Sequence, residues 1–287
     1  MKFLITGSKG QLGYDCVRKL EERGFNDVVG IDYEELDITH KEDVLSFVKN
    51  YAPDVIIHCA GYTAVDRAEE DIDKVYKVNV LGTRYLAEAA EENNCKMVYI
   101  STDYVFDGSG DDFYEPYDLA LPLSAYGKSK FDGEKAAAEK CSRLFIVRIS
   151  WAFGINGNNF VKTMLKLSET NHVLNIVSDQ IGSPTYTYDL SDLLIDMVLT
   201  EKYGVYHATN EGVCSWAEFA EEIFKLSKRN IIVKPISTNE YKAAKPKQAV
   251  RPLNSRLSKK CLDKAGFRRL PSWENALERY LKELNII

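Results

Sequence analysis

Short apolar runs alternate with amphipathic stretches along the first half of the chain. The runs have the length of buried strands and end at glycines or polar residues. Five runs are expected to be strands: residues 2–6, 27–32, 54–61, 97–100 and 144–150. The clearest helical stretch spans residues 71–94, and its expected apolar face consists of Val75, Val78, Leu81, Leu86 and Ala89. This alternation predicts an α/β fold with a doubly wound parallel sheet.

Beyond residue 150 the alternation becomes irregular. The elements still expected there are a helix from residue 158, strands at residues 173–177 and 204–208, a turn at residues 180–185, a helix at residues 216–228 that Ser215 caps, and a closing helix at residues 273–284. We therefore predict two units. Residues 1–150 form the sheet domain, and residues 151–287 form mainly a smaller C-terminal lobe that is interwoven with it.

Three glycines follow the first predicted strand directly. Gly7, Gly10 and Gly13 have G-x-x-G-x-x-G spacing, a variant of the dinucleotide-binding fingerprint, and an amphipathic helix follows them. Glycines at these places permit a tight turn, let the backbone approach a pyrophosphate and let the helix pack on the strand. Residues 1–150 are therefore predicted to be a Rossmann-type NAD(P)-binding domain. The alternative is a turn that only connects a strand to a helix.

Acidic residues follow the second predicted strand. Asp32 lies about twenty residues beyond the glycines, where a carboxylate accepts hydrogen bonds from both ribose hydroxyls, and this favours NADH. Lys9, in the glycine turn, could instead face a 2′-phosphate, so NADPH remains possible. Asp37 either binds the adenine amine or is a turn residue, and Ile38 is expected to pack on the adenine ring.

The third predicted strand ends in small residues, and a helix follows it. Ala60 and Gly61 leave room for a cofactor to lie across the sheet. Asn79, on the following helix, either holds a water or a backbone carbonyl near the catalytic residues or bridges within the core. His58 and His207 are expected to be structural core residues.

A strand end and a helix start supply the candidate catalytic residues. The fourth strand ends at Ser101, Thr102 and Asp103, and Tyr126 and Lys130 share one face of a helix because they are four residues apart. An ammonium beside a phenol is expected to lower the phenol's pKa, so that Tyr126 exchanges a proton with a carbonyl oxygen at neutral pH.

Tyr241 and Lys245 repeat the Tyr-x-x-x-Lys spacing without a preceding strand that ends in hydroxyls. This second match is expected to be a surface helix.

Two later segments are candidates for substrate contacts. Residues 107–123 form a long segment rich in Asp, Gly, Tyr and Pro, and such segments are often a lid or a wall of a substrate pocket. Arg251, beside Pro252, could bind a diphosphate through both guanidinium nitrogens, and Lys242, Lys245 and Lys247 add positive charge. A solvated basic loop is the equally weighted alternative.

Composition excludes several classes of function. The 287 residues carry a net charge of −6 without a dominant basic run, which argues against nucleic acid as a partner and favours a small molecule. The six cysteines are widely spread and predict neither a zinc site nor a disulfide framework, as expected for reduced thiols in the cytoplasm. The first residues are too short an apolar run for a signal peptide, and no stretch approaches membrane-spanning length.

These motifs together resemble the dTDP-4-dehydrorhamnose reductase family, within the extended short-chain dehydrogenase/reductase superfamily. The motifs that carry the resemblance are residues 7–13, 63–66 with Glu69, 101–108, Tyr126 with Lys130, 158–160, 179–185 and 251–257. The resemblance implies that the cofactor is bound by Gly10, Gln11, Leu12, Asp32, Asp37, Ile38, Gly61, Tyr62 and Thr63. It implies that the sugar nucleotide is bound by Thr102, Asp103, Tyr126 and Trp151.

The sequence departs from the family pattern in two places. Residues 58–61, His-Cys-Ala-Gly, stand where Asn and alanines are common, a change that should preserve the groove but can alter cofactor preference. Some family members pair through carboxylates that hold a divalent metal, and Asp15 and Asp189 sit near the matching positions. Asp15 and Asp189 have short carboxylate side chains, and no metal ligand is predicted from them.

The activity implied by the resemblance is NAD(P)H-dependent reduction of the C4 ketone of a dTDP-linked 6-deoxy-4-hexulose, giving dTDP-L-rhamnose. Tyr126 would donate the proton, Lys130 would hold the nicotinamide ribose, and Thr102 would bind the carbonyl oxygen. The alternatives are another nucleotide-sugar epimerase or dehydratase and a non-catalytic regulatory subunit. A cytoplasmic monomer or homodimer is expected.

Overall fold

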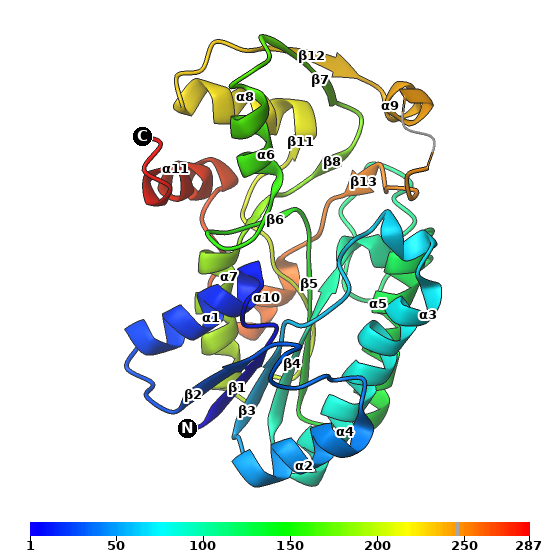
Figure 1. Ribbon diagram of the computed structural model, residues 1–287, viewed down its shortest axis with the longest axis vertical. Helices are drawn as coiled ribbons and strands as arrows, with labels where there is room; N and C mark the ends of the chain where they lie inside the picture. Colours follow the sequence, from blue (N-terminus) through cyan, green and yellow to red (C-terminus); the bar gives the residue numbers. More distant parts are fainter. Residues whose placement is uncertain (245–246) are drawn as a thin grey trace.

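The computed structural model describes residues 1–244 and 247–287. Its centre is a six-stranded sheet in the order β10-β5-β4-β3-β1-β2, and every neighbouring pair of strands is parallel (Figure 1). The strands are β1 (Phe3–Thr6), β2 (Val28–Ile31), β3 (Val55–His58), β4 (Lys96–Thr102), β5 (Leu144–Ile149) and β10 (Gly204–His207). The predicted doubly wound parallel sheet is confirmed.

The strand order reverses beside β1. Phe3 of β1 pairs with Val28 of β2 on one side and with Val55 of β3 on the other. The loops that leave the carboxyl ends of β1 and β3 therefore diverge to opposite faces, and ligands of open α/β sheets bind in the crevice outside such a point. The sheet thus predicts where the functional site lies.

Helices cover both faces of the sheet. One face carries α1 (Gln11–Glu22), α7 (Thr187–Val198) and α10 (Lys260–Ala265), and the other carries α2 (Lys41–Tyr51), α4 (Thr83–Glu92) and α5 (Ala125–Lys140) (Figure 1). Phe3 and Ile5 of β1 are buried against the first group, whereas Leu4 is buried against the second. Alternate residues of a strand point to opposite faces, so the continuous apolar run of β1 is explained by a sheet that is covered twice.

The helical stretch predicted at residues 71–94 is not uniform. It consists of α3 (Ile72–Tyr76), a wider π-helical turn (Lys77–Gly82) and α4. Such turns insert an extra residue and are frequent at functional sites. This one carries Asn79, whose amide faces the loop after β3.

The second lobe is small and lies above the carboxyl ends of the sheet strands (Figure 1). Its helices are α6 (Phe160–Leu167), α8 (Trp216–Leu226), α9 (Thr238–Ala244) and α11 (Trp273–Glu283). Its strands are β6 (Ala152–Phe153), β7 (Val173–Val177), β8 (Ile181–Gly182), β9 (Thr185–Tyr186), β11 (Cys214–Ser215), β12 (Ile232–Ile236) and β13 (Asn254–Ser255).

The sequence located most elements of this lobe. The predicted cap of α8 is confirmed, because Ser215 and Glu218 form a reciprocal capping box. The turn expected at residues 180–185 contains β8 and the start of β9. The division at residue 150 remains a prediction, and three elements from beyond it, α7, β10 and α10, belong to the layers of the sheet domain.

Among residues 1–244 and 247–287, no helix is both long enough and apolar enough to span a lipid bilayer.

Candidate active site

A cleft of about 840 Å³ opens at the carboxyl ends of the sheet strands. The loops that follow β1, β2, β3, β4 and β5 contribute to it, as the reversal of strand order predicts. Sixteen predicted site residues line it: Gly7, Gly10, Gln11, Leu12, Gly13, Asp32, Asp37, Ile38, Ala60, Gly61, Thr63, Thr102, Asp103, Tyr126, Lys130 and Trp151. The predicted residues Tyr62 and Arg251 do not line it.

The glycine turn has the geometry of a diphosphate cradle. Gly7 has a φ of +68°, and a Cβ on it would lie 2.7 Å from the backbone of Ala60. A Cβ on Gly13 would overlap the carbonyl oxygen of Gly7. No side chain caps the start of α1 at Gly10, so its first N–H groups and the positive end of its dipole face the cleft. These features fit the pyrophosphate of a dinucleotide.

Acidic groups surround the place predicted for the adenosine ribose. Asp32 accepts hydrogen bonds from the backbone N–H groups of Tyr33, at 2.8 Å, and Lys9, at 3.1 Å. The Lys9 ammonium is paired with Glu34 and, at 3.1 Å, with Glu35. These carboxylates, Glu34 first, raise the pKa of Lys9. Lys9 is therefore a neutralised cation, and the net charge of this corner is negative.

Asp37 and Ile38 form the far wall of the cleft. One oxygen of Asp37 accepts from the backbone N–H and the hydroxyl of Thr39, at 2.9 and 2.8 Å, which is the geometry of an Asx turn. The turn interpretation of Asp37 is thus observed, and its contact with adenine remains a prediction. Ile38 packs against Gly82, where a Cβ would approach its side chain to 2.8 Å.

Helix α5 positions the tyrosine and lysine. The Ser124 hydroxyl caps the helix by accepting from the backbone N–H of Gly127 at 3.0 Å. The Lys130 ammonium lies 4.1 Å from the centre of the Tyr99 ring, and the Tyr99 hydroxyl donates to the Lys130 carbonyl at 3.2 Å. Sheet residue Tyr99 therefore fixes Lys130 at the floor of the cleft.

Burial shifts the pKa values of both catalytic candidates. Loss of hydration lowers the pKa of Lys130 to about 7, although the charge of Glu134 opposes this shift. Burial raises the pKa of Tyr126 to about 12; the Thr102 hydroxyl opposes this rise, and the Asp103 charge adds to it. The predicted lowering of the Tyr126 pKa is therefore wrong in direction, because desolvation exceeds any effect of the lysine. Tyr126 is a neutral phenol at pH 7, with its proton available.

Asp103 is a buried carboxyl group next to Thr102. It accepts a hydrogen bond from the Thr102 hydroxyl at 3.0 Å and another from the Ser255 hydroxyl. Burial raises the pKa of Asp103 to about 6, and both hydroxyls act against this rise. The carboxyl group is mainly ionised at pH 7 and becomes protonated in mild acid.

Trp151 lines the cleft in a strained conformation. Its φ is +50°, in the left-handed region that residues with a Cβ rarely adopt. Its ring stacks on that of Trp216, with centroids 3.7 Å apart and planes inclined by 14°. A Cβ on Gly182 would approach the Trp151 ring to 2.9 Å. Stacking on Trp216 and close packing against Gly182 hold the indole at the cleft.

Tyr62 and Arg251 point elsewhere, and their predicted binding roles remain predictions. The Tyr62 hydroxyl donates to Asp71 at 2.7 Å. The Arg251 guanidinium pairs with Asp66 at 3.0 Å. Lys245, which belongs to the second Tyr-x-x-x-Lys match and to the basic segment, lies outside the described residues.

The segment at residues 107–123 does not line the cleft, and its role as a lid or a wall of the substrate pocket remains a prediction. It packs instead against residues 252–258. Gly108 abuts Pro252, and the Tyr114 backbone bonds to those of Arg256 and Ser258.

The two core histidines and Asn79 have structural surroundings. His58 lies between the hydroxyls of Thr6 and Thr83, at 2.7 and 3.0 Å, and burial lowers its pKa to about 3. His207 is also buried, and burial lowers its pKa to about 3. Asn79 bridges the Tyr62 backbone and the Ser129 hydroxyl. Asn79 thus holds a backbone carbonyl near Tyr126 and Lys130, which is the first of its two predicted roles, since Ser129 in turn donates to the Tyr126 carbonyl at 2.7 Å.

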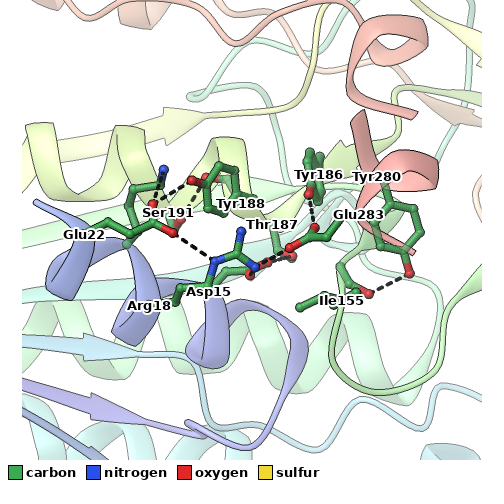
Figure 2. Close-up of polar contacts among 12 residues, drawn as sticks. Asp15, Arg18, Glu22, Ile155, Tyr186, Thr187, Tyr188, Ser191, Tyr280 and Glu283 are labelled. Atoms are coloured by element: carbon green, nitrogen blue, oxygen red, sulfur yellow. Dashed lines mark hydrogen bonds and ion pairs between the residues drawn. The ribbon is translucent and has the colours of Figure 1, made fainter. Parts of the chain in front are cut away.

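The two carboxylates near the metal positions of the resembling family do not fit a cation. Figure 2 shows Arg18 between Asp15, Glu22 and Glu283, and the Asp15 carboxylate accepts from Thr187. Asp189 is bound by both terminal nitrogens of Arg279, at 2.7 and 2.6 Å. Within residues 1–244 and 247–287, no three His, Cys, Asp or Glu side chains are grouped to hold a metal ion.

A buried ion pair between β5 and α5 supports the site, and it was not predicted from the sequence. Arg148 of β5 donates to both oxygens of Glu134 on α5, at 2.8 and 2.6 Å, and to the Pro116 carbonyl at 2.8 Å. Both charged side chains are 5% exposed. An arginine inside an otherwise apolar strand was the available signal, since a buried charge requires a partner.

Comparison with known proteins agrees with this geometry. The RmlD substrate binding domain family matches residues 1–286. A dTDP-4-dehydrorhamnose reductase from Aggregatibacter actinomycetemcomitans is 42% identical over 289 residues, covering 96% of this chain and 97% of that protein. The crystal structure of a dTDP-4-dehydrorhamnose reductase from Clostridium acetobutylicum has a TM-score of 0.95 at 40% identity, covering 99% of this chain and 100% of that one.

A second solved structure, a dTDP-4-dehydrorhamnose reductase from Bacillus anthracis in complex with NADP, has a TM-score of 0.94 at 42% identity. It covers 99% of this chain and 100% of its own. Matches of this identity over nearly the whole chain show common descent as well as a common fold. The chain belongs to the dTDP-4-dehydrorhamnose reductase family.

Proposed function

We propose that this protein reduces the C4 ketone of dTDP-4-dehydro-6-deoxy-L-mannose to dTDP-L-rhamnose with a reduced nicotinamide cofactor. One observation carries the proposal. Tyr126, Lys130 and Thr102 line the same cleft as a glycine turn that is shaped for a diphosphate. Such a cleft holds a dinucleotide and a keto sugar side by side, and the tyrosine supplies the proton.

The reduction needs a hydride, a proton and a stabilising charge. A reduced nicotinamide bound in the cleft supplies the hydride. The Tyr126 phenol, with its pKa raised to about 12, is fully protonated at pH 7 and donates its proton to the oxygen that gains charge. The Lys130 ammonium, where it is charged, stabilises that oxygen and the phenolate left behind.

The remaining residues orient the sugar. Thr102 and Asp103 form the polar side of the substrate site, and Trp151 offers an aromatic face to the apolar side of the ring. The three residues that follow Asp103 are Tyr104, Val105 and Phe106, so the chain has no acid directly after the Thr-Asp pair for the elimination of water. This favours reduction over dehydration.

We propose NADH as the preferred cofactor, with NADPH accepted. Asp32, Glu34 and Glu35 give the ribose corner a negative charge, and Lys9 is already paired with two of these acids. A 2′-phosphate adds about two negative charges there and must first separate Lys9 from its partners. The relative from Bacillus anthracis was solved in complex with NADP, and this supports the acceptance of NADPH.

The test is oxidation of NADH and NADPH, followed at 340 nm, with a panel of nucleotide-linked keto sugars. Turnover with the dTDP-4-keto sugar and release of dTDP-L-rhamnose support the proposal. Tight cofactor binding without turnover of any sugar refutes it and favours a binding role.

Asp32→Ala tests the cofactor preference. This variant removes the carboxylate nearest the ribose, so we expect kcat/KM for NADPH relative to NADH to rise roughly tenfold. Asp27→Ala, at the exposed opposite end of β2, is the matched control and should leave the ratio unchanged. An unchanged ratio in Asp32→Ala contradicts the proposed preference.

A further inference from the structure

Ser255, a polar residue of the second lobe, lies next to the catalytic candidates and donates a hydrogen bond to Asp103. Ser255 lies in β13, which pairs in parallel with β8 so that Ser255 is opposite Gly182. Its side chain is 2% exposed. A Cβ on Gly182 would lie 3.0 Å from the Cβ of Ser255 and 2.9 Å from the Trp151 ring. Ser255 is therefore buried and closely packed against Gly182.

The Ser255 hydroxyl is one end of a short chain of hydrogen bonds. Ser255 donates to one oxygen of Asp103, and Thr102 donates to the other oxygen at 3.0 Å. The Thr102 oxygen accepts from the backbone N–H of Tyr104 at 3.3 Å and interacts with the Tyr126 phenol. Asp103 thus holds two hydroxyls, one from each lobe, and one of them faces the proton donor.

We propose that Ser255 is a positioning residue for the reduction. By binding one oxygen of Asp103, Ser255 leaves the other oxygen to Thr102 and so keeps the Thr102 hydroxyl aligned with the Tyr126 phenol. The inference rests on the proposed function. It also explains why a serine stands in the 251–257 motif, whose Arg251 is paired with Asp66 away from the cleft.

The arrangement requires an ionised Asp103, because only a carboxylate accepts from both hydroxyls. The titratable groups against it are the Tyr104 and Tyr126 phenols, whose pKa values are both raised by burial, so neither changes charge near pH 6. The Arg251 guanidinium acts on Tyr104 and is paired with Asp66. With the pKa of Asp103 at about 6, activity falls as the pH decreases through that value.

The experiment compares Ser255→Ala with the wild type over pH 5–9. Because the Ser255 hydroxyl lowers the pKa of Asp103, its removal raises that pKa, and the acid limb of kcat/KM should move up by about one pH unit. We expect kcat at pH 7 to fall roughly tenfold while cofactor affinity stays unchanged. Ser255→Cys keeps the side-chain volume with a weaker donor and should move the same limb if Ser255→Ala folds poorly.

A double variant shows whether Ser255 acts through Asp103. Ser255→Ala combined with Asp103→Asn should lose no more activity than Asp103→Asn alone. Ser258→Ala is the control, since Ser258 is also buried in the same segment and its hydroxyl accepts from the Lys260 backbone N–H.

An acid limb that stays in place in both Ser255 variants overturns the inference, as do additive losses in the double variant. A wild type without turnover overturns the proposed function, and the inference with it. If the wild type turns over normally and Ser255→Ala has the same activity and pH profile, the inference is overturned but the proposed function is not.

Discussion

Replacing Glu134 by Gln should reduce activity at neutral pH by removing a charge that supports Lys130. Glu134 lies one helical turn after Lys130 on α5, buried in its ion pair with Arg148. Burial lowers the pKa of Lys130 to about 7, and the Glu134 carboxylate works against that shift. Without this carboxylate the pKa of Lys130 must fall further, because Glu134 is the larger of the two groups that oppose desolvation, and Cys59 is the smaller.

The expected size follows from the titration curve. With a pKa of about 7, roughly half of the Lys130 side chains are charged at pH 7. A further fall of about one unit leaves roughly a tenth charged, so kcat/KM at pH 7 should drop about fivefold. The loss of activity with rising pH should then begin about one pH unit lower than in the wild type.

Glu134→Gln also leaves the Arg148 guanidinium buried without its partner, at a cost of about 3–5 kcal/mol in unfolding free energy. The double variant Glu134→Gln/Arg148→Met removes both charges and should recover most of that stability. It should not recover activity at pH 7, since the carboxylate beside Lys130 is still absent. The two variants therefore separate the stability effect from the pKa effect.

The assay is kcat/KM against pH, with urea unfolding of the same samples. Glu139→Gln is the matched control, because Glu139 is an exposed residue of the same helix that pairs with Arg84 at 2.9 Å. An alkaline limb at the same pH in Glu134→Gln and the wild type refutes the reasoning. Full recovery of activity in the double variant refutes it as well.

Two further predictions concern the walls of the cleft. Trp151→Ala should raise KM for the keto sugar roughly tenfold and leave cofactor affinity unchanged in a fluorescence titration, because we propose that this indole of the cleft wall stacks on the sugar; an unchanged KM would exclude stacking. Gly13→Ala should abolish cofactor binding or destabilise the fold by several kcal/mol, because its Cβ overlaps the Gly7 carbonyl oxygen; normal binding and a normal melting temperature would contradict the cradle.

The fold and most cleft residues were predictable because their signals are local. The strand, the glycine turn and α1 follow one another within residues 3–22. The four-residue spacing of Tyr126 and Lys130 fixes their common helix face once α5 is recognised. Parallel strands bring their carboxyl ends to one edge, so recognising the sheet places the following loops together.

Contacts between distant segments were not predictable in the same way. Ser255 and Asp103 are 152 residues apart, and Arg251 and Asp66 are 185 apart. Arg251 has the residue type that binds a diphosphate, but a carboxylate of the chain itself satisfies it here. Only the packing of the second lobe on the first decides between these partners.

The pKa of Tyr126 could not be predicted from spacing either. Sequence places a lysine four residues away, which favours a lowered pKa, but it does not show how much water the phenol loses. In the folded protein desolvation is the largest effect and raises the pKa to about 12. A protonated phenol is still the form that a reductase needs at this position.

The most direct test of the central claim is single-turnover reduction of the dTDP-4-keto sugar by Tyr126→Phe. The variant removes one hydroxyl and keeps the ring, including its edge-to-face packing on Tyr104, whose ring centroid lies 5.5 Å away. We predict unchanged NADH affinity and a loss of about a hundredfold or more in the rate of ketone reduction. A rate near that of the wild type would show that Tyr126 is not the proton donor.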